Sequence, residues 1–196
     1  GCHSRSRHKS VPRVHVSDKH VLPRRTTVAH NLASTNGKTA MFYTGDAPWH
    51  RLGTRLDQPA TASEAMDAAG LGYGVTLKAL ATTDGTPVPM RKAVIRSDNG
   101  AVLGVVGNTY KPVQNKQAFE FLDAVVADGS LRYHTAGAIG QGERIWLLAK
   151  LPDTIRVGNT DDLVEKFLLL SNTHDGSTAL RVYFTPIRVV CQNTLN

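Results

Sequence analysis

The stretch that decides the fold is LRYHTAGAIGQGERIWLLAKL, residues 131–151. Its two halves, 131–138 and 144–151, carry β-prone residues with enough alternation to predict two strands. The Gly-Gln-Gly sequence at 140–142 favours a tight turn, so the stretch as a whole predicts a β-hairpin. Further on, the continuous apolar run FLLL at 167–170 predicts a central strand buried on both faces of a sheet.

The rest of the chain predicts more short strands than helices. A capping-box pattern, Thr61 followed by Glu64, opens a predicted helix over 62–69, and Asn115 caps a second one over 116–128. Further strands are predicted over 72–80, 90–98, 101–106, 163–171 and 178–190. Because hairpins outnumber helices and connections are short, we expect an α+β fold: a mainly antiparallel sheet built from hairpins and covered by two or more helices on one side.

Charge and aromatic content divide the chain into three parts. Residues 1–40 hold eight basic residues and one acid, which accounts for the whole net charge of +7. We therefore expect a basic disordered tail over 1–27, and the change of character at Val28 indicates a natural translation start there, with the tail as non-native upstream sequence. An irregular N-terminal segment is expected over 28–60. The α+β domain is expected over 61–196, truncated at its C-terminal end because the last residues read as the start of a further element.

Composition excludes several classes of protein. An apolar content of 41% is enough for a hydrophobic core, so wholesale disorder is excluded. No apolar run approaches the roughly 20 residues that a membrane-spanning helix requires. The two cysteines, Cys2 and Cys191, lie at opposite ends of the chain and make no disulfide framework. We therefore expect a cytoplasmic protein without a membrane partner.

Several longer motifs in the sequence resemble those of one family. They are MFY at 41–43, PWH at 48–50, YKPVQN at 110–115, LSNTHDGS at 170–177 and FTPIRVVCQNTLN at 184–196. Taken in this order, they resemble the phage/plasmid-like proteins that carry domain of unknown function 932. The likeness covers residues 28–196 and corresponds to the N-terminal part of the family. The family's activity is unsettled, so the resemblance implies a setting on mobile genetic elements and no mechanism.

The charge within the neutral remainder of the chain predicts a nucleic-acid interface. The predicted strands sum to +7, while helices and loops balance them. Strand alternation places Arg144, Trp146 and Lys150 on one face, Arg132 and His134 on a shared face of the partner strand, and Arg181 in the same parity as Tyr183. Basic and aromatic side chains on a sheet bind single strands, the charges contacting phosphates and the rings stacking on bases. The alternative is an ordinary solvated sheet face that simply carries Arg, Lys and Tyr.

We therefore expect an accessory protein of a phage or plasmid that binds nucleic acid, with single-stranded DNA favoured, and that is not an enzyme. A second hypothesis is a hydrolase or nuclease in which the Cys191 thiol pairs with His174, oriented by Asp175. A third is a protein–protein interaction module of unknown oligomeric state. No cofactor is indicated, and His50, His134 and His174 lack the spacing of metal ligands, so no metal site is predicted.

Overall fold

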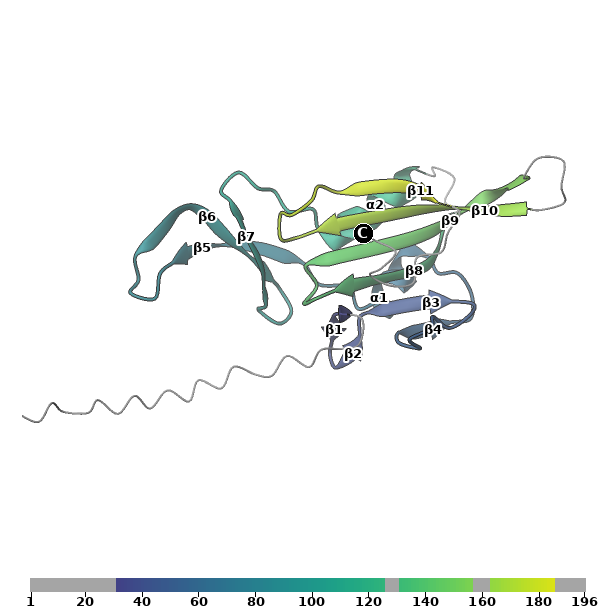
Figure 1. The fold of residues 1–196 in the computed structure, drawn as a ribbon, viewed down its shortest axis with the longest axis horizontal. Helices are drawn as coiled ribbons and strands as arrows, with labels where there is room; N and C mark the ends of the chain where they lie inside the picture. The colour runs from purple at the N-terminus through teal and green to yellow at the C-terminus, as the bar shows by residue number, and fades with distance from the viewer. Residues whose placement is uncertain (1–30, 126–130, 157–162, 186–196) are drawn as a thin grey trace, which may run out of the picture.

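The computed structural model describes residues 31–125, 131–156 and 163–185, and Figure 1 shows their arrangement. Two helices are α1 (Ala62–Ala68) and α2 (Asn115–Val125). The strands are β1 (Ser34–Thr35), β2 (Lys38–Thr39), β3 (Met41–Thr44), β4 (Thr54–Leu56), β5 (Val75–Ala81), β6 (Pro87–Arg96), β7 (Val102–Gly107), β8 (Arg132–Ile139), β9 (Arg144–Arg156), β10 (Leu163–Thr173) and β11 (Arg181–Thr185). Neither helix in these ranges is long and apolar enough to cross a membrane. The tail expected over 1–27 lies outside the described residues.

The largest element is a six-stranded sheet with the order β11-β10-β9-β8-β3-β4. The predicted hairpin is confirmed: β8 and β9 pair antiparallel, with Ile139 opposite Arg144, and Gly140 takes a φ of +70° in the turn. The strand around 167–170 is also confirmed, because β10 lies between β9 and β11 and pairs antiparallel with both. Only β3 and β4 run parallel among the paired strands of this sheet. The fold class is α+β, as expected from the sequence.

Alternating side chains give this sheet two different faces. Ile145, Leu147 and Ala149 on β9 join the main hydrophobic core, together with the buried residues of both helices. Trp146 and Leu148 point to the other side and form a second, smaller core with Phe167 and Leu169 on β10. Both helices lie behind the sheet in the view of Figure 1. The side without helices is called the open face below, because no helix covers it; the residues of the smaller core on this side are nevertheless buried.

The segment 28–60, expected to be irregular, contributes two strands to the main sheet within its described part. β3 pairs antiparallel with β8, so that Phe42 lies opposite Ala136, and β4 then pairs with β3. Phe42 and Met41 are fully buried, one in each core. Burial of two large apolar side chains on a strand of four residues explains why the segment is ordered against β8.

A separate three-stranded sheet, β5-β6-β7, projects from the side of the six-stranded sheet (Figure 1). The sequence predicted these strands but not that they would form a sheet of their own. Arg96, fully buried on β6, fixes the base of this projection. Its guanidinium pairs with Asp98, donates to the Gln141 carbonyl at 2.8 Å and lies 3.8 Å from the Tyr73 ring centre. These contacts connect the projecting sheet to the turn between β8 and β9.

The first helix begins as the sequence predicted. The backbone N–H of Glu64 donates to the Thr61 hydroxyl, and the Glu64 carboxylate accepts from the Thr61 backbone, which completes the capping box. The hydrogen bonds of the Glu64 carboxylate to Thr61 hold its pKa below the ordinary value. The helix is short and buries chiefly Ala65, so it acts as a cover over the main core.

Candidate nucleic-acid interface

Strand register brings most of the predicted interface residues onto the open face. Arg181 on β11 lies opposite Ser171 on β10, which in turn lies opposite Trp146 on β9. One row further along, Tyr183 lies opposite Leu169. Because paired residues share a face, these side chains point to the same side as Trp146. Arg144, the first residue of β9, and Lys150, near the middle of the strand, lie on this side too.

The two predicted aromatic partners in the middle of this face are buried, so the prediction that they form an exposed platform is wrong. Trp146 is fully buried, and its Nε1 has no hydrogen-bond partner among the described residues. His134 is 7% exposed; its Nδ1 lies 3.2 Å from the Thr44 hydroxyl and its ring meets Phe167 edge-on. Strand alternation predicts the face on which a side chain lies, but not whether that face is covered.

Arg132 and Lys150 form the last pair of the β8–β9 ladder, but their side chains point in different directions. Lys150 forms an ion pair with Glu165 on β10, and both side chains are partly exposed. Arg132 lies opposite Lys150 in the ladder, but its Nη1 donates to the Leu131 carbonyl at 2.9 Å and its guanidinium lines a pocket beside α1. Arg132 therefore points away from the open face, contrary to the sequence prediction.

The residues of β11 are the most accessible part of the predicted set. Arg181 is exposed, and Tyr183 retains 44% of its accessible surface. The Arg181 guanidinium donates to the Tyr183 hydroxyl at 3.4 Å. A cation and a phenol ring are thus placed side by side on the edge strand, an arrangement that can contact a phosphate and stack on a base.

Sequence reasoning missed two residues of this face. Register places Tyr43 of β3 opposite Arg55 of β4, and Tyr43 packs against the smaller core, so both lie on the open side. Arg55 is exposed and Tyr43 half-buried. The run MFYT at 41–44 carried a usable strand signal, since aromatic residues favour strands.

Charge is segregated between the two sides of the main sheet. The open side carries the cations Arg55, Arg144, Lys150 and Arg181, and one of these is neutralised by Glu165. The two helices on the other side carry four carboxylates, Glu64, Asp67, Glu120 and Asp123, against Lys116 of α2 and the Arg132 guanidinium that lines the pocket beside α1. The described sheet therefore has a basic open side and an acidic helical side.

The first residue of the hydrolase hypothesis, His174, belongs to a buried network. Asn115 Nδ2 donates to the carbonyls of Leu71 and Tyr73, which orients the amide so that its Oδ1 faces His174. This Oδ1 accepts from His174 Nε2 at 2.8 Å, so neutral His174 carries its proton on Nε2. Nδ1 is buried without a partner in the described part of the chain.

Burial lowers the pKa of His174 from its ordinary value of 6.5 to about 4, and the positive charge of Arg96 adds to this effect. Burial also raises the pKa of the neighbouring Tyr73 to about 12. Tyr73 donates its hydroxyl proton to the Gly142 carbonyl at 2.8 Å. A fully buried, neutral histidine that orients the first residue of α2 fits a role in structure and not in proton transfer to a substrate.

Asp175 does not orient the His174 ring. Its carboxylate accepts the backbone N–H of Ser177 at 2.8 Å, which closes the turn after β10. Cys191 lies outside the described residues, so the proposed thiol cannot be placed. Within the described part, the geometry of His174 and Asp175 is that of a turn packed against a helix end.

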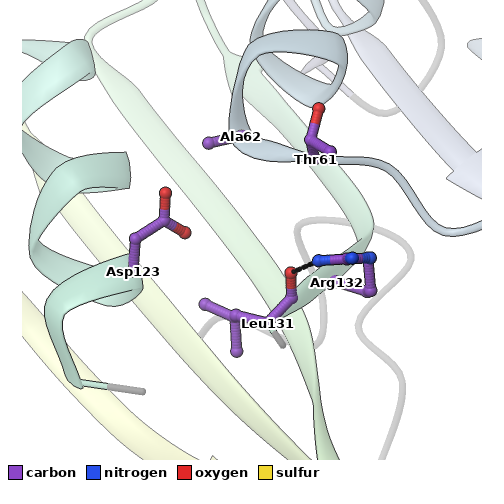
Figure 2. A pocket seen from close by; sticks show the side chains of 5 residues that line it. All are labelled: Thr61, Ala62, Asp123, Leu131 and Arg132. Atoms are coloured by element: carbon purple, nitrogen blue, oxygen red, sulfur yellow. Dashed lines mark hydrogen bonds between the residues drawn. The ribbon is translucent and has the colours of Figure 1, made fainter. Parts of the chain in front are cut away.

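One small cavity of about 150 Å³ lies between the helices (Figure 2). It is lined by Thr61, Ala62, Asp123, Leu131 and Arg132. The Tyr133 hydroxyl donates to Asp123 at 2.8 Å, and burial together with this carboxylate raises the pKa of the phenol. The cavity is below the roughly 300 Å³ at which ligand sites usually begin. No three His, Cys, Asp or Glu side chains gather as metal ligands in residues 31–125, 131–156 and 163–185.

Fold and site define the class: an α+β protein whose antiparallel sheet has an acidic helical side and a basic open side. Residues 102–196 match the family model described as Domain of unknown function (DUF932). This match supports the resemblance over that segment of the chain. Neither a curated protein nor a solved structure matches the chain.

Proposed function

We propose that this protein binds single-stranded nucleic acid, with DNA favoured, along the open side of the six-stranded sheet. The observation that supports the proposal is the segregation of charge across that sheet. Arg144 and Arg181 lie on the side that also carries Arg55 and the Lys150–Glu165 ion pair, whereas the helices are acidic. A phosphate chain would be attracted to the first side and repelled by the second.

The dimensions of the basic side suit a short single strand. Arg144 and Lys150 are separated by six positions along β9, which corresponds to roughly 20 Å. Single-strand platforms on small sheets engage from about four nucleotides upward. Among the predicted interface residues, Tyr183 is the ring that remains accessible for stacking, because Trp146 and His134 are buried. Binding would accordingly depend mainly on phosphate contacts and show little base preference.

We further propose the setting: a cytoplasmic accessory protein of a phage or plasmid that acts in replication or recombination of the element. The setting follows from the family resemblance and not from the geometry. His174 is buried and bonded to Asn115, an arrangement that does not favour a hydrolase built on this residue.

The proposal is tested by titrating a labelled oligothymidylate with the full chain at several salt concentrations. Replacing two cations of the open side, Arg144→Gln with Arg181→Gln, is expected to weaken binding about tenfold. Each lost phosphate contact should reduce the slope of log affinity against log salt by about 0.7. The matched control replaces two cations elsewhere, Lys78→Gln with Lys116→Gln, and should leave the slope unchanged.

Equal losses of affinity in both double variants would contradict the proposal. Binding would then follow the total charge of the chain, to which the basic residues before Val28 contribute, and not the charge of the open side. Absence of binding at low salt would contradict it as well. Competition with oligouridylate of equal length decides between DNA and RNA.

A further inference from the structure

One end of the main sheet carries a group of exposed apolar side chains. On β11, Phe184 is 69% exposed and Val182 36% exposed. On α2, Phe121 is 47% exposed and Val125 52% exposed. Single exposed apolar residues are common on proteins, but a contiguous group marks an interaction surface.

The four side chains lie on the same side of the sheet. Register places Phe184 opposite Leu168 and Val182 opposite Leu170, and both leucines belong to the core beneath the helices. The two β11 side chains therefore point to the helical side. Phe184 and Val182, together with Phe121 and Val125 of α2, are called the edge patch below.

The helix turns its two exposed apolar residues toward this edge. Asp123 on one flank of α2 accepts from Tyr133 of β8. Phe121 and Val125 are four positions apart and occupy the opposite flank, beyond the buried Ala118 and Leu122. Since the strand order is β11-β10-β9-β8, the flank away from β8 faces β10 and β11. α2 contacts β10 accordingly.

Strand β11 is the outer strand at this end, and it lacks the features that protect edges from pairing. Its sequence RVYFT contains one charge, at its first residue, and no proline. Its pairing with β10 shows no register shift, so no bulge twists it away. Within the described strands, its outer backbone groups face no further strand.

We propose that the edge patch is a self-association surface, at which β11 pairs antiparallel with β11 of a second copy around a twofold axis at Tyr183. In the only antiparallel register that pairs all five residues, each strand's sole charge, Arg181, lies opposite the neutral Thr185 of the other copy. Val182 then lies opposite Phe184 on the helical side. The strand is thus complementary to itself in charge and in apolar contact, as a twofold interface requires.

The axis determines the architecture of the dimer. Two six-stranded sheets join into one, the α2 helices approach each other over the same side, and Phe121 and Val125 pack across the axis. Both open sides then face the same direction. The apolar area of the edge patch is about 400 Å² per copy. Together with Tyr183 and the strand backbones, this approaches the roughly 1,200 Å² of the smallest standard interfaces, so we expect association in the micromolar range.

Sedimentation velocity of the full chain tests the proposal over about 1–200 μM. We expect the mass to rise from 21.2 kDa toward twice that value. Phe184→Lys is expected to weaken association tenfold or more. Because Phe184 is 69% exposed, this change should leave the thermal unfolding midpoint of the monomer nearly unchanged. The matched control is Ser63→Lys, on an exposed position of α1 far from β11.

Cross-linking tests the register, in a background with Cys2→Ser and Cys191→Ser. Tyr183→Cys places the thiol of one copy opposite the same thiol of the second copy, with about 5 Å between the two Cα atoms, which is within reach of a disulfide. Val182→Cys lies on the same strand, but the Cα atoms of residue 182 in the two copies are about 8 Å apart, which is beyond the reach of a disulfide. With oxidised glutathione, we expect covalent dimer from the first variant and little from the second.

A chain that stays monomeric at 200 μM overturns the proposal, as does a dimer that Phe184→Lys leaves intact. Equal cross-linking of both cysteine variants would indicate random collision and overturn the register. A mass above the dimer would also contradict it, because a closed twofold interface stops at two copies.

Discussion

The junction between the two sheets depends on Arg96, and the substitution Arg96→Lys tests this directly. The guanidinium makes two contacts with Asp98, at 2.7 and 2.9 Å, and donates to Thr35 and to Gln141 at 2.7 and 2.8 Å. It also lies over the ring of Tyr73. A lysine keeps the positive charge and one contact with Asp98, but its single ammonium cannot reach the other acceptors.

The expected cost follows from the contacts that are lost. Hydrogen bonds from a charged donor contribute about 1.5–3 kcal/mol each when buried, and contacts with partly buried acceptors fall at the lower end. Losing the bonds to Thr35 and Gln141 therefore costs about 3 kcal/mol, with the stacking on Tyr73 adding up to about 1 kcal/mol. This is a large part of the stability of an ordinary domain.

Urea unfolding followed by circular dichroism measures this cost, with the midpoint and the slope both fitted. The matched control is Arg91→Lys, an exposed position on the same strand, which should stay within about 0.5 kcal/mol of the original chain. If Arg96→Lys is equally mild, the buried guanidinium does not hold the projecting sheet, and the account of the junction fails.

Three further predictions follow from buried groups. Burial lowers the pKa of His174 to about 4 in the fold, so the unfolded chain binds a proton on this ring more readily than the folded chain does. The contribution of His174 to the free energy of unfolding is therefore complete above pH 6.5 and falls by about 3 kcal/mol toward pH 4. His174→Gln should abolish this loss in urea midpoints measured across that pH range. Gly104→Ala should cost about 1–3 kcal/mol, because its Cβ would lie 2.6 Å from the Asp175 backbone, while Gly107→Ala on the same strand meets nothing within 4 Å and should be neutral in thermal unfolding. Trp146→Phe should cost about 1–3 kcal/mol, which is the cost of the cavity left by the smaller ring, since the indole N–H that it removes has no partner in the described chain. A cost well above about 3 kcal/mol would mean that this N–H is bonded.

Much of the fold could be predicted from local sequence. The hairpin of β8 and β9 followed from β-prone runs around a glycine turn, and α1 followed from Thr61 and Glu64. β10 followed from a continuous apolar run, as befits a strand buried on both faces. The strands β3 and β4 were missed because each is short, and they gain stability by pairing at the edge of β8.

The candidate site was predicted less well, for a physical reason. Alternation correctly placed Arg144, Trp146 and Lys150 on one side of β9. It could not show that Trp146 is buried, that Lys150 is paired with Glu165, or that Arg132 turns to the pocket beside α1. Each of these depends on residues far away in the sequence.

By itself, the sequence determined the α+β class, the central hairpin and the side of β9 on which Arg144, Trp146 and Lys150 lie. Those properties depend on turn chemistry and on a period of two residues, which are local. The tertiary structure decided which of these side chains reach solvent, because exposure depends on what packs over a face. It also decided that Arg96 and His174 are buried, and that the apolar residues of β11 and α2 meet at one edge. Distant segments come together only when the core forms, and their contacts, not their spacing, set the chemistry of the surface.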